Sequence, residues 1–102
     1  GAAALAALAG LNVDRLFFSV SGLHPVKGFT DSNVEEIEVK RALHGIAATS
    51  VALVDGSKFG RTALYELLGP GEVGRLVTDR PLPVELARRL EAGGVGIEVA
   101  DA

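Results

Sequence analysis

The sequence predicts an α/β fold, in which a Rossmann-like layer of parallel strands packs against helices. Three observations predict this class: short apolar runs recur along the chain, helix-forming segments separate them, and small or polar residues close most of the runs. Strands that alternate with helices are typical of a parallel sheet with both faces covered. The expected order is helix, strand, helix, strand, an uncertain segment, strand, helix and strand.

Three helices are expected. Residues 1–11 are rich in Ala and Leu, which have high helix propensity. Residues 33–46 have the clearest helical pattern of the chain. The third helix covers residues 83–91, because Pro83 suits its first turn and Gly93 lies just past its end.

Four buried strands are expected where short apolar runs stand between turn residues. Residues 22–32 are predicted to be a loop punctuated by Gly and Pro. Residues 63–68 could be helix or strand. The predicted strands are residues 15–20, 49–54, 75–78 and 95–99.

Composition narrows the function. The chain has 102 residues, enough for one domain or a piece of one, and no start methionine, so we expect a piece of a longer protein. Its net charge of −3, without a basic run, argues against direct binding to DNA or to an anionic membrane. It has no cysteine, which excludes disulfides and thiolate chemistry and fits a cytoplasmic protein. The apolar run of residues 1–11 is too short to span a bilayer.

Polar residues follow three of the predicted strands. The carboxyl ends of parallel strands lie along one edge of a sheet, where ligands of open α/β sheets bind. The sequence therefore predicts a polar pocket at that edge. The residues expected to gather there are Ser21–Gly22, Asp55–Lys58 and Asp79–Arg80.

Glu35 is a candidate for this pocket. It falls on the apolar face of the predicted helix, so its carboxylate is expected to point toward the sheet edge. The alternative is a capping box, in which Glu35 is tied back to Ser32 and serves only to begin the helix. That apolar face consists of Val39, Ala42, Leu43 and Ile46.

Four further residues lie near the start of the same helix. Glu36 and Lys40 have the i,i+4 spacing of a solvent-facing ion pair, and we expect Lys40 to be structural. Asp31 and Asn33 lie at the junction of loop and helix, where they can act as helix caps. The free amides of the same junction can also receive an anion.

Asp55 and Lys58 are the strongest candidates. Both follow a buried strand, and Gly56 between them permits a tight turn. Lys58 can bind a phosphate as a point charge, and Asp55 can accept hydrogen bonds from hydroxyl groups. The alternative is a pair that merely closes the turn.

Other chemistry is not indicated. His24 and His44 alone do not make a metal site, which needs several convergent ligands. The glycines of residues 93–96 precede a strand, whereas a dinucleotide fingerprint follows one. We therefore expect no cofactor, no metal and no catalytic residue.

Two segments resemble the effector-binding domain of DeoR-type transcriptional regulators. The first resembles the D-x-S-K-F-G signature of that domain. The second is similar to its G-[LF]-T-x-x-N-x-E-E-x-x-V-K-R run, and the distance between the two also fits. The segments are Asp55-Gly56-Ser57-Lys58-Phe59-Gly60 and Gly28-Phe29-Thr30-Asp31-Ser32-Asn33-Val34-Glu35-Glu36-Ile37-Glu38-Val39-Lys40-Arg41.

The resemblance implies a sugar-phosphate sensor. Its fold would be similar to that of ribose-5-phosphate isomerase and CoA-transferases, with residues 1–102 as the C-terminal portion of the domain. The effector would be a phosphorylated sugar, and operator DNA would be bound only by an N-terminal helix-turn-helix domain missing from this chain. The regulator would be a cytoplasmic repressor and a homo-oligomer, without membrane contact. The effector-binding residues that it implies are Gly22, Asp31, Glu35, Glu36, Asp55 and Lys58.

Two other functions remain open from the sequence. The first is a sugar-phosphate isomerase-like enzyme on the same fold, in which an acid and a lysine would move protons. Turnover would distinguish this enzyme from a sensor. The second is an interaction module that presents an exposed sheet to a partner subunit. Oligomer formation without ligand binding would favour it.

Overall fold

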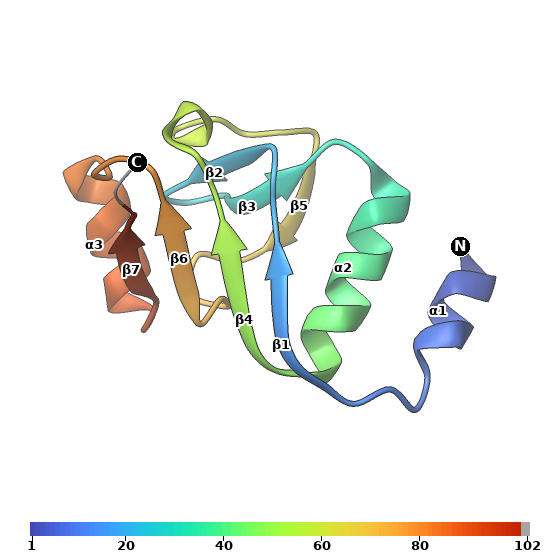
Figure 1. Cartoon of the computed structure of the whole chain (residues 1–102). Helices are drawn as coiled ribbons and strands as arrows, with labels where there is room; N and C mark the ends of the chain where they lie inside the picture. Colours follow the sequence, from blue (N-terminus) through green and yellow to red (C-terminus); the bar gives the residue numbers. More distant parts are fainter. Residues whose placement is uncertain (101–102) are drawn as a thin grey trace.

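The structure, a computed structural model, describes residues 1–100 and confirms the α/β class (Figure 1). A four-stranded sheet has the order β1-β4-β6-β7, with every neighbouring pair parallel. The bounds of its strands lie within two residues of those expected. They are β1 (Val13–Phe18), β4 (Ala47–Leu53), β6 (Arg75–Thr78) and β7 (Gly96–Val99).

A second sheet was not anticipated. The prediction of a loop over residues 22–32 is wrong, because this segment forms a hairpin of two short strands, and residues 63–68 contain a strand rather than a helix. The turn of the hairpin is closed by His24, whose Nδ1 accepts hydrogen bonds from the amides of Val26 and Lys27 at 3.0 and 3.2 Å. The antiparallel order is β2-β3-β5, formed by β2 (Gly22–His24), β3 (Gly28–Asp31) and β5 (Tyr65–Leu68).

The three helices lie close to their expected positions. They are α1 (Ala2–Leu8), α2 (Val34–Ile46) and α3 (Val84–Ala92), and a 3₁₀ turn, η1 (Gly56–Lys58), follows β4. None of the helices within residues 1–100 is long and apolar enough to cross a membrane.

Helix α2 begins one residue later than the capping-box prediction requires. Its N-cap is Asn33, whose side-chain oxygen accepts hydrogen bonds from the amides of Glu35 and Glu36 at 3.0 and 3.1 Å. Asn33 satisfies two of the amides that every helix leaves unpaired at its start. The expected role of Asn33 as a cap is therefore confirmed, and the alternative with Ser32 is not formed.

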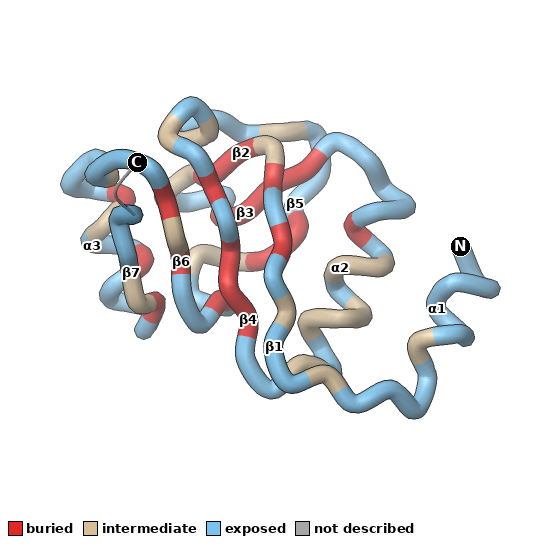
Figure 2. Tube along the Cα trace, viewed as in Figure 1, coloured by how far each residue is buried: buried red, intermediate tan, exposed pale blue. Residues whose placement is uncertain are grey.

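The parallel sheet is covered on one face only within the described residues, which corrects the prediction of two covered faces. Both β1 and β4 contain buried residues next to exposed ones (Figure 2). Phe18 is 6% exposed and its neighbour Phe17 56%, and Ala52 is 0% and its neighbour Leu53 46% exposed. The cause is topological. The strands follow one another across the sheet in chain order, and right-handed crossovers then place every connection on the same side.

The core lies between the covered face of the parallel sheet and the antiparallel sheet, α2 and α3. Phe18 of β1 meets Phe29 of β3 edge to face, with ring centroids 6.3 Å apart, so the two sheets share one core. Its buried residues come from both sheets, from α2 and from α3, and they include Leu23, Ile37, Ala52, Leu67, Leu76, Leu86 and Leu90.

The one-sided core can be tested with two neighbouring phenylalanines. Phe18→Ala is expected to lower the free energy of unfolding by about 3–5 kcal/mol, because it leaves a cavity. Phe17→Ala is expected to cost less than about 1 kcal/mol, because its side chain lies largely in water. Urea denaturation followed by circular dichroism measures both values.

The same titrations at two protein concentrations provide the control. A face buried between two copies would make the loss at Phe17 large and dependent on concentration. Equal losses at both positions and at both concentrations would contradict a core on one side of the sheet.

Candidate functional site at the carboxyl edge of the sheet

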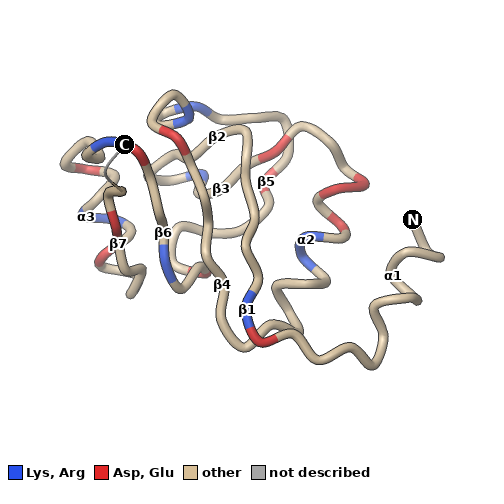
Figure 3. The backbone as a smooth tube through the Cα atoms, in the orientation of Figure 1, with Lys and Arg blue, Asp and Glu red and all other residues tan. Residues whose placement is uncertain are grey.

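The exits of three adjacent parallel strands carry most of the predicted site residues. Because β1, β4 and β6 are neighbours in the sheet, the segments that follow them lie side by side at one edge. Figure 3 shows acidic and basic residues together at the turn after β4 and after the end of β6. The edge thus has the polar character that the sequence predicts.

The turn after β4 is organised by Asp55, which is the N-cap of η1. Its Oδ2 accepts hydrogen bonds from the amide of Ser57, at 3.2 Å, and from the Ser57 hydroxyl. The Ser57 hydroxyl is the main cause that holds the pKa of the Asp55 carboxyl below its usual value, so the group is a carboxylate at neutral pH.

Lys58 is the cation of this turn. Its Nζ lies 3.4 Å from Oδ1 of Asp55, and its side chain is 32% exposed. An ion pair in contact with water stabilises little. Lys58 can therefore exchange Asp55 for an anionic group of a ligand at low cost.

The exit of β6 is joined to the same turn. The amide of Gly56 donates a 2.7 Å hydrogen bond to Oδ1 of Asp79, and this bond is the main cause that lowers the pKa of the Asp79 carboxyl. Arg80 lies across Gly56, so a Cβ at this position would collide with the Cγ, Cδ and Nε atoms of Arg80. Gly56 thus lets the Arg80 side chain lie close against the backbone of the turn.

The exit of β1 is closed by a buried ion pair. Asp31, which is 6% exposed, accepts a 2.7 Å hydrogen bond from Ser21 Oγ and another of 2.7 Å from Lys40 Nζ. Lys40 also donates to the carbonyl of Ser19 at 2.7 Å. The pair therefore fastens α2 and β3 to the segment that leaves β1, and both Asp31 oxygens are engaged inside the protein.

These contacts set the ionisation of Asp31. Burial by itself raises the pKa of the carboxyl. The hydrogen bonds from Lys40, Ser21 and the Ser32 amide outweigh burial and hold the pKa below its usual value. Asp31 is thus a carboxylate whose charge is balanced within the fold.

Gly22 is buried behind this pair. A Cβ at Gly22 would lie 2.5 Å from the carbonyl oxygen of Arg61 and 2.8 Å from Thr30 Oγ1. Thr30 Oγ1 in turn donates to the Gly22 carbonyl and accepts from the Ala63 amide, at 3.3 and 2.8 Å. Gly22 therefore lets the segment after η1 pack directly on β2.

Glu35 and Glu36 lie away from the strand exits, which corrects the expected orientation of α2. Both are exposed, and with Val39 they line a hollow of about 370 Å³ between α1 and α2. The face expected to cover the sheet turns toward α1 instead. The side of α2 that meets the core carries the buried Ile37. Beside it lie three polar residues whose side chains contact backbone carbonyl oxygens of other segments, namely Lys40, Arg41 and His44.

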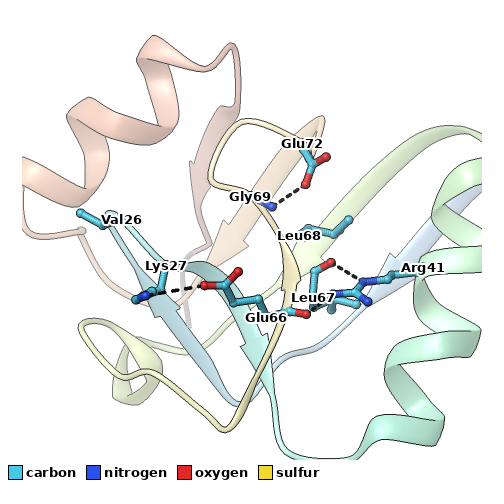
Figure 4. A pocket seen from close by; sticks show the side chains of 8 residues that line it. All are labelled: Val26, Lys27, Arg41, Glu66, Leu67, Leu68, Gly69 and Glu72. Carbon is cyan, nitrogen blue, oxygen red and sulfur yellow. Dashed lines mark hydrogen bonds and ion pairs between the residues drawn. The ribbon is translucent and has the colours of Figure 1, made fainter.

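A hollow of about 390 Å³ beside β5 was not predicted (Figure 4). Its charges are already balanced: Lys27 pairs with Glu66 at 3.8 Å, and Arg41 donates to the carbonyl oxygens of Glu66 and Leu67. Arg41 thereby binds the backbone of β5 to α2. We assign Arg41 a structural role, because its hydrogen bonds hold α2 to β5, whereas the exposed pair of Lys27 with Glu66 stabilises little.

Within residues 1–100, no group of three or more His, Cys, Asp or Glu side chains is placed to hold a metal ion. His24 closes the hairpin turn, and His44 Nε2 lies 2.6 Å from the carbonyl oxygen of Glu72. Both histidines thus have contacts within the fold.

Comparison with known proteins identifies relatives along the whole chain. Residues 1–80 match the sequence model of the DeoR C terminal sensor domain. The chain is 28% identical over 91 residues to the HTH-type transcriptional regulator GolR of Listeria innocua, covering 89% of this chain and 36% of that protein. It is 30% identical over 101 residues to the HTH-type transcriptional repressor GlcR of Bacillus subtilis, covering 99% and 39%.

A shorter match has higher identity. The deoxyribose operon repressor of Escherichia coli is 44% identical over 48 residues, which are 47% of this chain and 19% of that protein. The chain spans a little over a third of the length of GolR and GlcR.

The buried pair at the exit of β1 can be tested through pH. The folded-state pKa of Asp31 is lowered, so its charge stabilises the fold above the usual carboxyl pKa, and this contribution is lost as pH falls through the folded pKa. Asp31→Asn is expected to cost about 1–3 kcal/mol at pH 7, because Lys40 loses its buried partner. The difference from the parent should shrink in acid, as measured by urea denaturation at pH 7 and pH 3.

Glu36→Gln is the matched control, because it removes an exposed carboxylate from the start of α2. Its stability should stay within about 0.5 kcal/mol of the parent at both pH values. An Asp31→Asn variant as stable as the parent at pH 7 would show that the pair does not hold the β1 exit.

Proposed function

The chain belongs to the DeoR C-terminal sensor domain family, and we propose that it is the C-terminal portion of the effector-sensing domain of a bacterial transcriptional regulator. The effector is a phosphorylated sugar or a related metabolite, and its binding controls the attachment of the regulator to DNA. The observation that carries this proposal is the turn Asp55–Lys58, which presents a loosely paired lysine at the carboxyl edge of a parallel sheet.

The chemistry of this turn suits a sugar phosphate. Lys58 offers a cation to the phosphate, and Oδ1 of Asp55 can accept a hydrogen bond from a sugar hydroxyl. The names of two relatives refer to sugar operons, the deoxyribose operon repressor and the L-fucose operon activator. We assign direct contact with the effector to Asp55 and Lys58.

The other predicted residues take supporting roles in this proposal. Gly22 and Asp31 are buried, and they hold the β1 exit against β2 and α2 beside the effector. Glu35 and Glu36 would face parts of the regulator that pack near α1, because they line the hollow between α1 and α2. In this proposal two of the six predicted residues contact the effector directly, and the other four support the site or face other parts of the regulator.

DNA binding belongs to a different part of the proposed regulator. The relatives GolR and GlcR are HTH-type regulators, and the chain covers a little over a third of each. Its net charge of −3 is unsuited to phosphate contacts along DNA. We propose a cytoplasmic repressor that works as a homo-oligomer, with a helix-turn-helix outside residues 1–102.

Binding without turnover is the favoured activity. An isomerase-like enzyme needs a base whose pKa lies near the working pH. The pKa of Asp55 is held below its usual value by Ser57, which makes this carboxylate a weak base. The relatives are also named as regulators rather than enzymes.

Lys58→Ala is expected to weaken the binding of phosphorylated sugars. A thermal-shift screen would compare ribose 5-phosphate, fructose 6-phosphate and glucose 6-phosphate with the three unphosphorylated sugars. A ligand that binds the folded state raises the melting temperature by mass action. The parent should respond to at least one phosphorylated sugar, and the response should fall by about tenfold or more in apparent affinity without the Lys58 cation.

Lys27→Ala is the control, because Lys27 is an exposed lysine paired with Glu66 beside β5. This variant should respond as the parent does. Lys58→Ala binding as tightly as the parent would refute the role of Lys58, and conversion of any of these sugars would point to an enzyme.

A further inference from the structure

The exit of β6 has an unexplained polar atom. Thr78 is 4% exposed, and its Oγ1 has no hydrogen-bond partner within the described residues. A buried hydroxyl without a partner is costly, so such a group calls for a ligand or water that completes it. Thr78 also lines a hollow of about 420 Å³ together with Asp55 and Asp79.

Two cations stand beside this hollow. Lys58 Nζ lies 3.4 Å from Asp55, and Arg80 Nε lies 3.5 Å from Asp79 Oδ1, so each cation is next to an acid that lines the hollow. Arg80 is 59% exposed, and its pairing with Asp79 is as loose as that of Lys58 with Asp55. Both can turn to an anion without leaving a buried charge.

Each of the two acids accepts a hydrogen bond from the turn after β4. Asp55 Oδ2 binds Ser57, and Asp79 Oδ1 binds the Gly56 amide, so one oxygen of each carboxylate shapes the turn. These bonds, with Arg80 lying across Gly56, make the β4 turn and the β6 exit a single structure. The two acids that line the hollow are therefore held together by the contacts between the exits of β4 and β6.

We infer that the exit of β6 forms the second wall of the effector site, with Arg80 as a second phosphate-binding cation and the Thr78 hydroxyl as the partner of a sugar hydroxyl. This inference rests on the proposed function. It limits the ligand to a molecule that can bind Arg80 through its phosphate and the Thr78 hydroxyl through a hydroxyl group at the same time. Arg80 suits the phosphate because its planar guanidinium can donate two parallel hydrogen bonds.

Calorimetric titration of the 102-residue chain with ribose 5-phosphate, fructose 6-phosphate, glucose 6-phosphate and inorganic phosphate tests the inference. Arg80→Gln should weaken the binding of the phosphorylated sugar by about tenfold or more, the usual effect of a lost hydrogen bond to a charged group. Arg88→Gln is the matched control. Arg88 is an exposed arginine of α3 paired with Glu85, and its loss should leave the affinity unchanged.

Thr78→Val separates a binding role from a structural one. If the hydroxyl serves to bind a ligand, the ligand-free variant should melt at the same temperature as the parent or higher, because an unpaired buried polar group has been removed. The variant should also bind the sugar phosphate about tenfold more weakly. A lower melting temperature with unchanged affinity would overturn the role of Thr78.

The outcomes also separate this inference from the proposed function. If the parent binds a phosphorylated sugar and only Lys58→Ala weakens it, the second wall is refuted and the sensor stands. If the parent binds none of these ligands, both are overturned for this chain. Weakening by Arg80→Gln and Thr78→Val, with Arg88→Gln unchanged, supports the second wall.

Discussion

The handedness of the connections between parallel strands determines most of this molecule. Four strands follow one another across the sheet in chain order, and right-handed crossovers place α2, α3 and the small antiparallel sheet on the same side. That side becomes the core, and the opposite face keeps Phe17 and Leu53 exposed. The same order brings three strand exits next to one another, so one topological constraint produces both the one-sided core and the polar edge.

The second sheet links the core to that edge. Strand β3 ends in Asp31, and the buried pair of Asp31 with Lys40 binds α2 to the segment after β1. Gly22, at the start of β2, lets the segment after η1 approach closely. The exits of β1 and β4 are thus held by a sheet that lies behind them, and the position of Lys58 depends on residues far from it in the sequence.

Sequence patterns predict the elements that depend on interactions between residues close together in the chain. The strands of the parallel sheet and the long helix were found to within a few residues, since apolar runs, a capping Asn33 and Pro83 act over short distances. Strands β2, β3 and β5 were missed or left open, because strands of three or four residues gain their hydrogen bonds from partners distant in the chain. The predicted orientation of α2 was wrong. Lys40 and Arg41 lie on the side of α2 that meets the core, where they donate to the carbonyl oxygens of Ser19 and Leu67, and a pattern of polar and apolar residues cannot reveal such contacts. The close contact of Arg80 with Gly56 likewise joins residues of two different strand exits.

Desolvation decides which charges at the edge can serve a ligand. Asp31–Lys40, Asp55–Lys58 and Asp79–Arg80 are three pairs of opposite charge, so these six residues together carry no net charge. If Lys40 turned to a phosphate, it would leave a carboxylate that is 6% exposed without its partner, at a cost of several kcal/mol. Lys58 and Arg80 would leave carboxylates that water can solvate. In the proposed sensor, Lys58 and Arg80 are therefore the cations that bind an anion, while the buried pair of Asp31 with Lys40 fixes the geometry of the edge.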